Sequence, residues 1–229
     1  MIRARYAAAT LAALAVAVAI PSVATVKTVS RDGEATVYLS RDFSKPFDLA
    51  YAVTLRPALG NTSFATAGVM VLGMVGPASV YVGVYSGPTG KVAAFTTMTG
   101  AARTNAFKTL SSCLPSCTIE LRGDAKNIQA LVNDRVVGTW MRSALRLVRP
   151  YVQINAEATA IGDSVHASLT TVRATIDGEK LPAPTCAITT QGVEPTVDPN
   201  VIWFSGTRRA DARVTYISLV DGRAMDRCP

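Results

Sequence analysis

The sequence predicts an all-β protein, a sandwich of two antiparallel sheets that follows an apolar N-terminal segment. Beyond residue 24, helical periodicity is almost absent. Short segments rich in Val, Thr, Ile and Tyr recur there between clusters of Gly, Pro, Asn and Asp, which is typical of strands and turns. Several segments are apolar at consecutive positions, as in GVMVLGM at 68–74, so we expect central strands covered on both faces.

The first 24 residues have the features of a cleaved export signal. Arg3 and Arg5 precede an apolar run over 6–20, and Pro21 is followed by the small-residue trio that ends at Ala24. The run is shorter than the about 20 residues that cross a bilayer. We therefore expect a signal peptide over 1–24, a single domain over 25–229, a secreted protein, and no stable membrane anchor after cleavage.

The net charge argues against a nucleic-acid partner. It is +7 for the whole chain, and losing the two signal arginines lowers it to +5. The basic residues are dispersed, and no run of five or more like charges occurs.

Four cysteines follow the signal, and an even number in an exported chain predicts disulfides. Three pairings are formally possible. We favour Cys113 with Cys117, closing the CLPSC loop, and Cys186 with Cys228, tethering the C-terminal end. A zinc site is disfavoured, because zinc requires four ligands and His166 is the single histidine.

The N-terminal half of the domain should form a series of short strands. Asp32 and Gly33 suit a tight hairpin turn between VKTVS and ATVYLS. Further strands are predicted over 47–55, 67–72, 80–85 and 92–98.

The middle of the chain gives the clearest pattern. CTIELRG alternates Ile119 and Leu121 with polar residues, as a half-buried strand does. NIQALV and RVVGTW should then form a hairpin around Asn133 and Asp134, which tolerate the left-handed conformation.

A second hairpin is predicted from arms over 151–160 and 164–176, with Gly162 and Asp163 as its turn. A two-residue turn places Thr159 opposite His166 and separates apolar from polar side chains, whereas a three-residue turn mixes them. The resulting polar face contains Gln153, Asn155, Glu157, Thr159, His166, Ser168 and Thr170, with Tyr151 on the same side.

The end of the chain is less regular. Prolines at 182, 184, 195 and 199 disfavour interior strands, so this stretch is predicted to be a surface excursion. Closing strands are expected over 201–204 and 214–220.

Residues 118–178, chiefly TIELRGDAKNIQALVNDRVVGTW and LRPYVQINAEATAIGDSVHASLTTVRATIDG, resemble the concanavalin A-like and laminin G-like jelly rolls in the order of their elements. The resemblance covers about a quarter of the chain. It implies two antiparallel sheets and a family in which many members bind or cleave polysaccharides. The chain lacks the E-x-D-x-x-E strand of the group's hydrolases, which argues against hydrolysis.

The polar face is the candidate ligand site, with Tyr151, Gln153, Asn155, Glu157 and His166 as its proposed contacts. Amides and carboxylates supply the donors and acceptors that sugar hydroxyls need. The alternative is the hydrated side of an amphipathic hairpin, which antiparallel sheets commonly have.

An enzyme is the less favoured interpretation. Glycoside hydrolysis needs two carboxylates, and Glu120 with Glu157 is the single pair we nominate. The letters Gly162–Asp163–Ser164 fit a turn better than an esterase motif, because no third catalytic group accompanies His166. Walker and Rossmann patterns are absent from the sequence, so no nucleotide or redox cofactor is expected, and no metal.

Three functional hypotheses therefore stay open. The first is an extracellular protein that binds a glycan or another small ligand. The second is a carbohydrate-active enzyme, a glycoside hydrolase or lyase that uses Glu120 and Glu157. The third is a structural or protein-interaction module of the cell exterior.

Overall fold

The structure is a computed structural model. It describes residues 33–40, 45–61, 63–72, 79–99, 105–113, 115–145, 151–158, 161–190, 193–198, 201–207 and 214–228. The predicted signal, the Asp32 turn and the first arm of its hairpin lie outside these residues. No helix in the described part of the chain is long and apolar enough to span a membrane.

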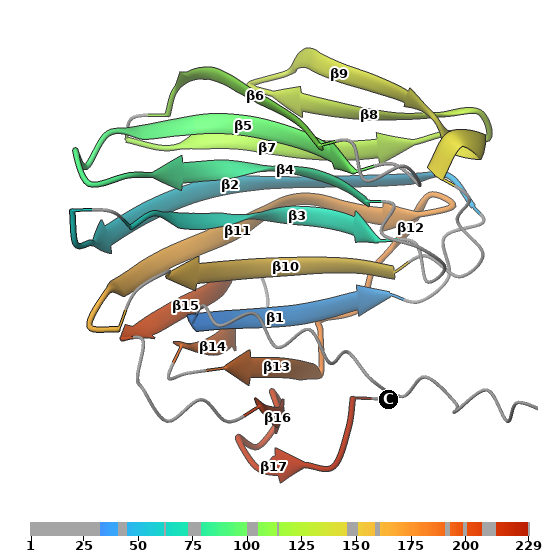
Figure 1. Cartoon of the computed structure of the whole chain (residues 1–229). Helices are drawn as coiled ribbons and strands as arrows, with labels where there is room; N and C mark the ends of the chain where they lie inside the picture. Colours follow the sequence, from blue (N-terminus) through green and yellow to red (C-terminus); the bar gives the residue numbers. More distant parts are fainter. Residues whose placement is uncertain are drawn as a thin grey trace, which may run out of the picture.

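The described strands form two antiparallel sheets packed face to face, which confirms the predicted fold class (Figure 1). The nine-stranded sheet contains, in spatial order, β17 (Ala224–Met225), β16 (Val214–Ser218), β13 (Cys186–Thr190), β1 (Gly33–Ser40), β10 (Tyr151–Ala158), β3 (Ala65–Leu72), β4 (Ser79–Ser86), β5 (Val92–Thr99) and β6 (Asn105–Ser112). The eight-stranded sheet contains β14 (Val193–Asp198), β15 (Val201–Thr207), β11 (Ser164–Ile176), β2 (Phe47–Ala58), β7 (Cys117–Gly123), β8 (Asn127–Val132) and β9 (Arg135–Met141), with β12 (Glu179–Lys180) paired to β11. A short 3-10 helix, η1 (Arg142–Leu145), follows β9.

The core lies between the sheets and is built by alternation. In β7, Ile119 and Leu121 are fully buried in the core, while Arg122 is exposed on the other side of the strand. Tyr51 of β2 and Phe204 of β15 are the largest fully buried side chains among the described residues. Burial raises the pKa of Tyr51, because the phenolate loses its hydration.

The predicted hairpin between β8 and β9 is confirmed. Asn133 and Asp134 both have positive φ, 48° and 62°, as a two-residue hairpin turn requires. Trp140 of β9 packs partly buried against the core, as we expect of a large aromatic residue in a sheet. The side chain of Trp203 lies outside the described residues.

The predicted hairpin between residues 151–160 and 164–176 is wrong. The two arms form β10 and β11, but β10 pairs with β1 and β3 in one sheet, whereas β11 pairs with β2 and β15 in the other. The turn at Gly162 therefore joins the two layers instead of two neighbouring strands (Figure 1). Alternation fixes which side chains of a strand share a face, but it does not identify the partner strand.

Residues 186–190 and 193–198 also differ from the prediction of a surface excursion. They form β13, an interior strand between β16 and β1, and β14, an edge strand of the other sheet. Pro195 is tolerated because β14 has a single neighbour. Strand β6 was not predicted at all.

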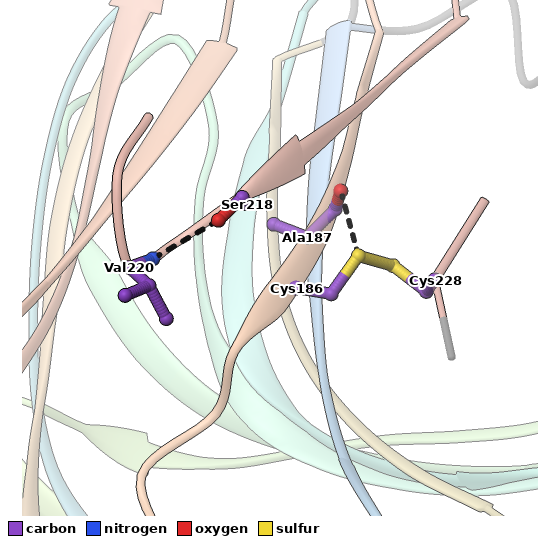
Figure 2. Close-up of a disulfide and its surroundings, with 5 residues drawn as sticks. All are labelled: Cys186, Ala187, Ser218, Val220 and Cys228. Atoms are coloured by element: carbon purple, nitrogen blue, oxygen red, sulfur yellow. Dashed lines mark hydrogen bonds between the residues drawn. A yellow bond between two sulfur atoms is a disulfide. The ribbon is translucent and has the colours of Figure 1, made fainter. Parts of the chain in front are cut away.

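Both predicted disulfides are present. Cys113–Cys117 joins the end of β6 to the start of β7 and so connects the two sheets. Cys186–Cys228 ties the end of the chain to β13 across a sequence separation of 42 residues. Figure 2 shows it beside Ser218, whose hydroxyl accepts a hydrogen bond from the Val220 N–H at 3.4 Å.

Candidate functional site

Strand β10 lies near the middle of the nine-stranded sheet, between β1 and β3. Its residues Val152, Ile154, Ala156 and Ala158 are fully buried in the core. The alternate positions are those of the predicted ligand residues Tyr151, Gln153, Asn155 and Glu157. Gln153 is 6% exposed on the outward face, and Glu157 is half-buried.

The neighbouring strands place aromatic residues on the same face. Gln153 lies opposite Met70 of β3, which lies opposite Tyr81 of β4. The Gln153 amide nitrogen approaches the Met70 sulfur at 3.8 Å, a contact with a weak acceptor. Four residues further along β10, Glu157 lies opposite Thr66 of β3, which lies opposite Tyr85 of β4.

Tyr81, Phe95 and Tyr85 form a cluster that we call the outer aromatic cluster. The rings of Tyr81 and Phe95 are 5.0 Å apart, and those of Tyr85 and Phe95 are 5.6 Å apart and edge to face. Tyr81 and Phe95 are each 5% exposed, whereas Tyr85 is half-buried. Tyr85 is therefore the accessible member of the cluster.

Two glycines make room for the Tyr81 ring. A Cβ atom on Gly68 would lie 2.6 Å from this ring, and one on Gly83 would lie 2.5 Å from it. The outer aromatic cluster was not predicted from the sequence, although VYVGVYS alternates Tyr81, Gly83 and Tyr85 with buried valines. That alternation is the signal that could have found it.

His166 does not join the other predicted ligand residues. It lies on β11 and is exposed on the outward face of the eight-stranded sheet, between Arg56 of β2 and Ser205 of β15. Its companion Ser168 shares a 2.6 Å hydrogen bond with Thr54. The predicted polar face is thus divided between the two outer faces of the sandwich.

Glu120 and Glu157 are also separated. Glu120 lies on β7 between two core residues, so its side chain is on the outward side of the eight-stranded sheet, and Glu157 is on the outward side of the nine-stranded one. Two packed sheets, about 10 Å apart, lie between them. The two carboxylates cannot act as one acid–base pair.

The environment of Glu120 is unusual for a glutamate on an outward face. It is 2% exposed, and its Oε2 accepts a 2.8 Å hydrogen bond from Arg173 Nη2. Burial and, to a smaller extent, the charge of Asp48 raise the pKa of Glu120, and Arg173 and Arg122 partly offset this rise.

The turn at Gly162 and Asp163 has a structural role. Asp163 is 4% exposed, and its Oδ1 accepts a 2.8 Å hydrogen bond from the Gly60 N–H in the connection between β2 and β3. Among the described residues, no group of three or more His, Cys, Asp or Glu side chains is arranged to hold a metal ion.

Sequence comparisons give no relatives: no protein-family model matches the chain, and no curated protein matches it. Solved structures give weak similarities. Scytalido-glutamic peptidase with a transition state analog inhibitor has a TM-score of 0.49 and 13% identity over 77% of this chain and 98% of its own. The laminarinase catalytic domain from Thermotoga maritima MSB8 has a TM-score of 0.40 and 10% identity over 56% of this chain and 66%, just under two-thirds, of its own. Bacillus licheniformis beta-glucanase has a TM-score of 0.38 and 7% identity over 75% of this chain and 69% of its own. At these TM-scores and identities, the similarities carry no conclusion about activity.

Proposed function

We propose that the chain is an exported protein that binds a carbohydrate on the outward face of its nine-stranded sheet, with β10 at the centre of the site. One observation carries the proposal: Gln153 and Glu157 share this face with Tyr81 and Tyr85 of the outer aromatic cluster, which lie two strands away on β4. Adjacent strands are about 4.8 Å apart, so the polar and aromatic groups are about 10 Å apart across the face.

This combination suits a sugar. Its hydroxyl groups need donors and acceptors, which an amide and a carboxylate supply, and its C–H faces pack on aromatic rings. Tyr85 is half-buried and can present ring surface, while Gln153 is held in place by its burial. Tyr151 and Asn155 occupy the same alternate positions of β10 and belong to the proposed site.

A glycan array and polysaccharide pull-downs test the proposal. We expect binding by the native protein and its loss in Gln153→Ala, Asn155→Ala, Glu157→Gln and Tyr85→Ala. Glu179→Gln is the matched control, because it makes the same chemical change at an exposed glutamate of β12, in the other sheet. Binding that all four site variants retain would eliminate the β10 face.

His166→Ala distinguishes the β10 site from the polar face that the predicted hairpin would have formed. Because His166 lies on the opposite outer face, glycan binding should not change. A loss equal to that of Glu157→Gln would favour the predicted hairpin face and contradict the arrangement of the two sheets.

Export is part of the proposal and is supported by the two disulfides, since such bonds persist in oxidising compartments. N-terminal sequencing of the protein recovered outside the cytoplasm should give Thr25 as its first residue. A chain that still begins at Met1 would contradict the cleaved signal.

A further inference from the structure

A second cluster of polar side chains lies on the opposite outer face, over the centre of the eight-stranded sheet. Ala50 of β2 lies directly between Arg173 of β11 and Glu120 of β7. Because alanine has a single methyl group, the arginine side chain can cross β2 above it. Asp48 lies two residues before Ala50, so it is the diagonal neighbour of Glu120.

Arg173 joins the two carboxylates through one oxygen of each. Its Nε donates to Asp48 Oδ2 at 2.9 Å, and its Nη2 donates to Glu120 Oε2 at 2.8 Å. The other two oxygens, Asp48 Oδ1 and Glu120 Oε1, are buried and accept no hydrogen bond from the described residues. The structure therefore holds two buried carboxylate oxygens, on diagonally neighbouring residues, that need donors.

Among the described residues, Arg122 is a candidate donor to Glu120 Oε1, but its guanidinium is bound to another residue. Its Nη1 is 3.8 Å from Glu120 Oε1, which is too long for a hydrogen bond, while its Nε donates to Gln129 of β8 at 2.8 Å. The Arg122 and Arg173 side chains are 46% and 47% exposed. Both can move without disturbing the core and so open a path to the buried oxygens.

Buried polar atoms without partners are rare in folded proteins, because each loses its hydration without compensation. The pKa of Glu120 is also raised, as is common at functional sites. These observations point to a ligand that supplies the missing donors.

The surroundings indicate the kind of ligand. Two guanidinium groups face the carboxylates of Asp48 and Glu120, and Asp134 adds the weakest of the charge effects on Glu120, so at most one negative charge is left over to attract a cation. Two exposed apolar side chains lie on nearby strand positions: Val172, 50% exposed, directly precedes Arg173, and Val136, 49% exposed, lies two strands from Glu120 through Leu131. A neutral molecule with several hydroxyl donors and some apolar surface fits these features best.

We propose that Asp48, Glu120 and Arg173 form a second ligand site, on the face opposite β10, for a molecule with neighbouring hydroxyl groups, as in a sugar or polyol. The two unpaired carboxylate oxygens accept from two hydroxyl groups of the ligand. The site shares its ligand class with the proposed function but none of its residues.

Nuclear magnetic resonance of the full mature protein tests the site directly. The probes are glucose and 1,2-propanediol, with 1,3-propanediol as the control that lacks adjacent hydroxyls. We expect glucose and the 1,2-diol to shift the carboxyl carbon of Glu120 and the Nε–H of Arg173, and the 1,3-diol to leave both unshifted. No response to any probe, or an equal response to both diols, overturns the inference.

Two variants locate the response. Glu120→Gln replaces an acceptor by an amide of the same shape and should weaken glucose binding by about tenfold or more, since a buried polar group is left mispaired. Gln129→Ala removes the hydrogen-bond partner of Arg122, so that Arg122 can donate to Glu120 Oε1, and it should also weaken glucose binding. This variant tests the site if Glu120→Gln does not fold. Glu179→Gln is the control that should bind as the native protein does.

The outcome separates this site from the one on β10. Binding that survives both Glu120→Gln and Gln129→Ala but is lost in Glu157→Gln overturns this inference and leaves the proposed function standing. A glucose response at the Arg173 Nε–H that is lost in Glu120→Gln and retained in Glu157→Gln supports the second site, and the glycan array then tests the β10 site separately.

Discussion

At the scale of single residues, Gly68 shows how tightly the face below the outer aromatic cluster is packed. A Cβ atom at Gly68 would lie 2.4 Å from the Val82 carbonyl oxygen and 2.6 Å from the Tyr81 ring. Because the Val82 carbonyl oxygen is a backbone atom, moving it aside costs free energy. We expect Gly68→Ala to lower the free energy of unfolding by about 1 to 3 kcal/mol, the usual cost of overpacking.

Urea denaturation followed by circular dichroism measures this change. Gly87→Ala is the matched control, because a Cβ atom there would meet nothing within 4 Å, and its effect should stay within about 0.5 kcal/mol. Equal effects of the two substitutions would contradict the close packing of Tyr81 on Gly68.

Glu120 should give the stability of the protein a distinctive pH dependence. Its folded-state pKa is raised above the ordinary value of 4.5, first by burial and then by Asp48, against the opposing effects of Arg173 and Arg122. The folded state therefore binds the proton more tightly than the unfolded state. Glu120 contributes most to stability below the ordinary pKa, and this contribution is lost as the pH rises through the raised value.

The comparison of native protein with Glu120→Gln isolates this effect. Unfolding free energies measured by urea from about pH 4 to about pH 7 should show the native protein losing stability relative to the variant as the pH rises. A difference that is constant, or that grows in favour of the native protein, would show that the pKa of Glu120 is not raised.

At the scale of elements, the connection between β10 and β11 depends on Asp163. This carboxylate, 4% exposed, accepts from the Gly60 N–H at 2.8 Å and so ties the crossing between the sheets to the connection after β2. Asp163→Ala leaves that N–H without its acceptor and should cost about 1 to 3 kcal/mol in thermal or urea unfolding. Asp163→Asn keeps an oxygen at the same place, so it should cost less, and equal losses would mean that the hydrogen bond is not the cause.

Many of the strands could be predicted from the sequence. A strand that buries one face must alternate apolar and polar residues, and this alternation can be recognised within a short segment. The strands around Ile119, Ile128 and Val165 are where the pattern places them. Pairing could not be predicted for β10 and β11, because their partners come from distant segments. The interior position of β13 was not predicted because prolines surround it in the sequence. Pro182 and Pro184 lie before the strand and Pro195 lies in edge strand β14, while Pro199 is outside the described residues.

The candidate sites were predictable to a smaller extent, for the same reason. Gln153 and Glu157 share a face because they are four residues apart on one strand, and this spacing is read directly from the sequence. His166 was assigned to that face through a pairing that does not exist. The burial of Glu120 could not be foreseen, since it depends on Arg173, 53 residues away in the chain.

At the scale of the whole molecule, the two disulfides restrain the unfolded chain to different extents. Cys186 and Cys228 are 42 residues apart in sequence, and Cys113 and Cys117 are 4 apart. The chain-entropy model assigns about 4 kcal/mol to the longer loop and about 2 kcal/mol to the shorter one. Replacing each pair by alanines should therefore lower the unfolding free energy more for Cys186–Cys228.

Urea unfolding of the two double variants at equal pH and temperature checks this order. The longer disulfide closes the end of the nine-stranded sheet, because β13, β16 and β17 all lie within its loop or next to it. The shorter one joins the two sheets through half-cysteines that are 2% and 4% exposed in the core, so its loss adds a packing defect to the entropy term. A larger loss for Cys113–Cys117 would show that contact between the sheets, and not restraint of the unfolded chain, dominates the stability that these bonds provide.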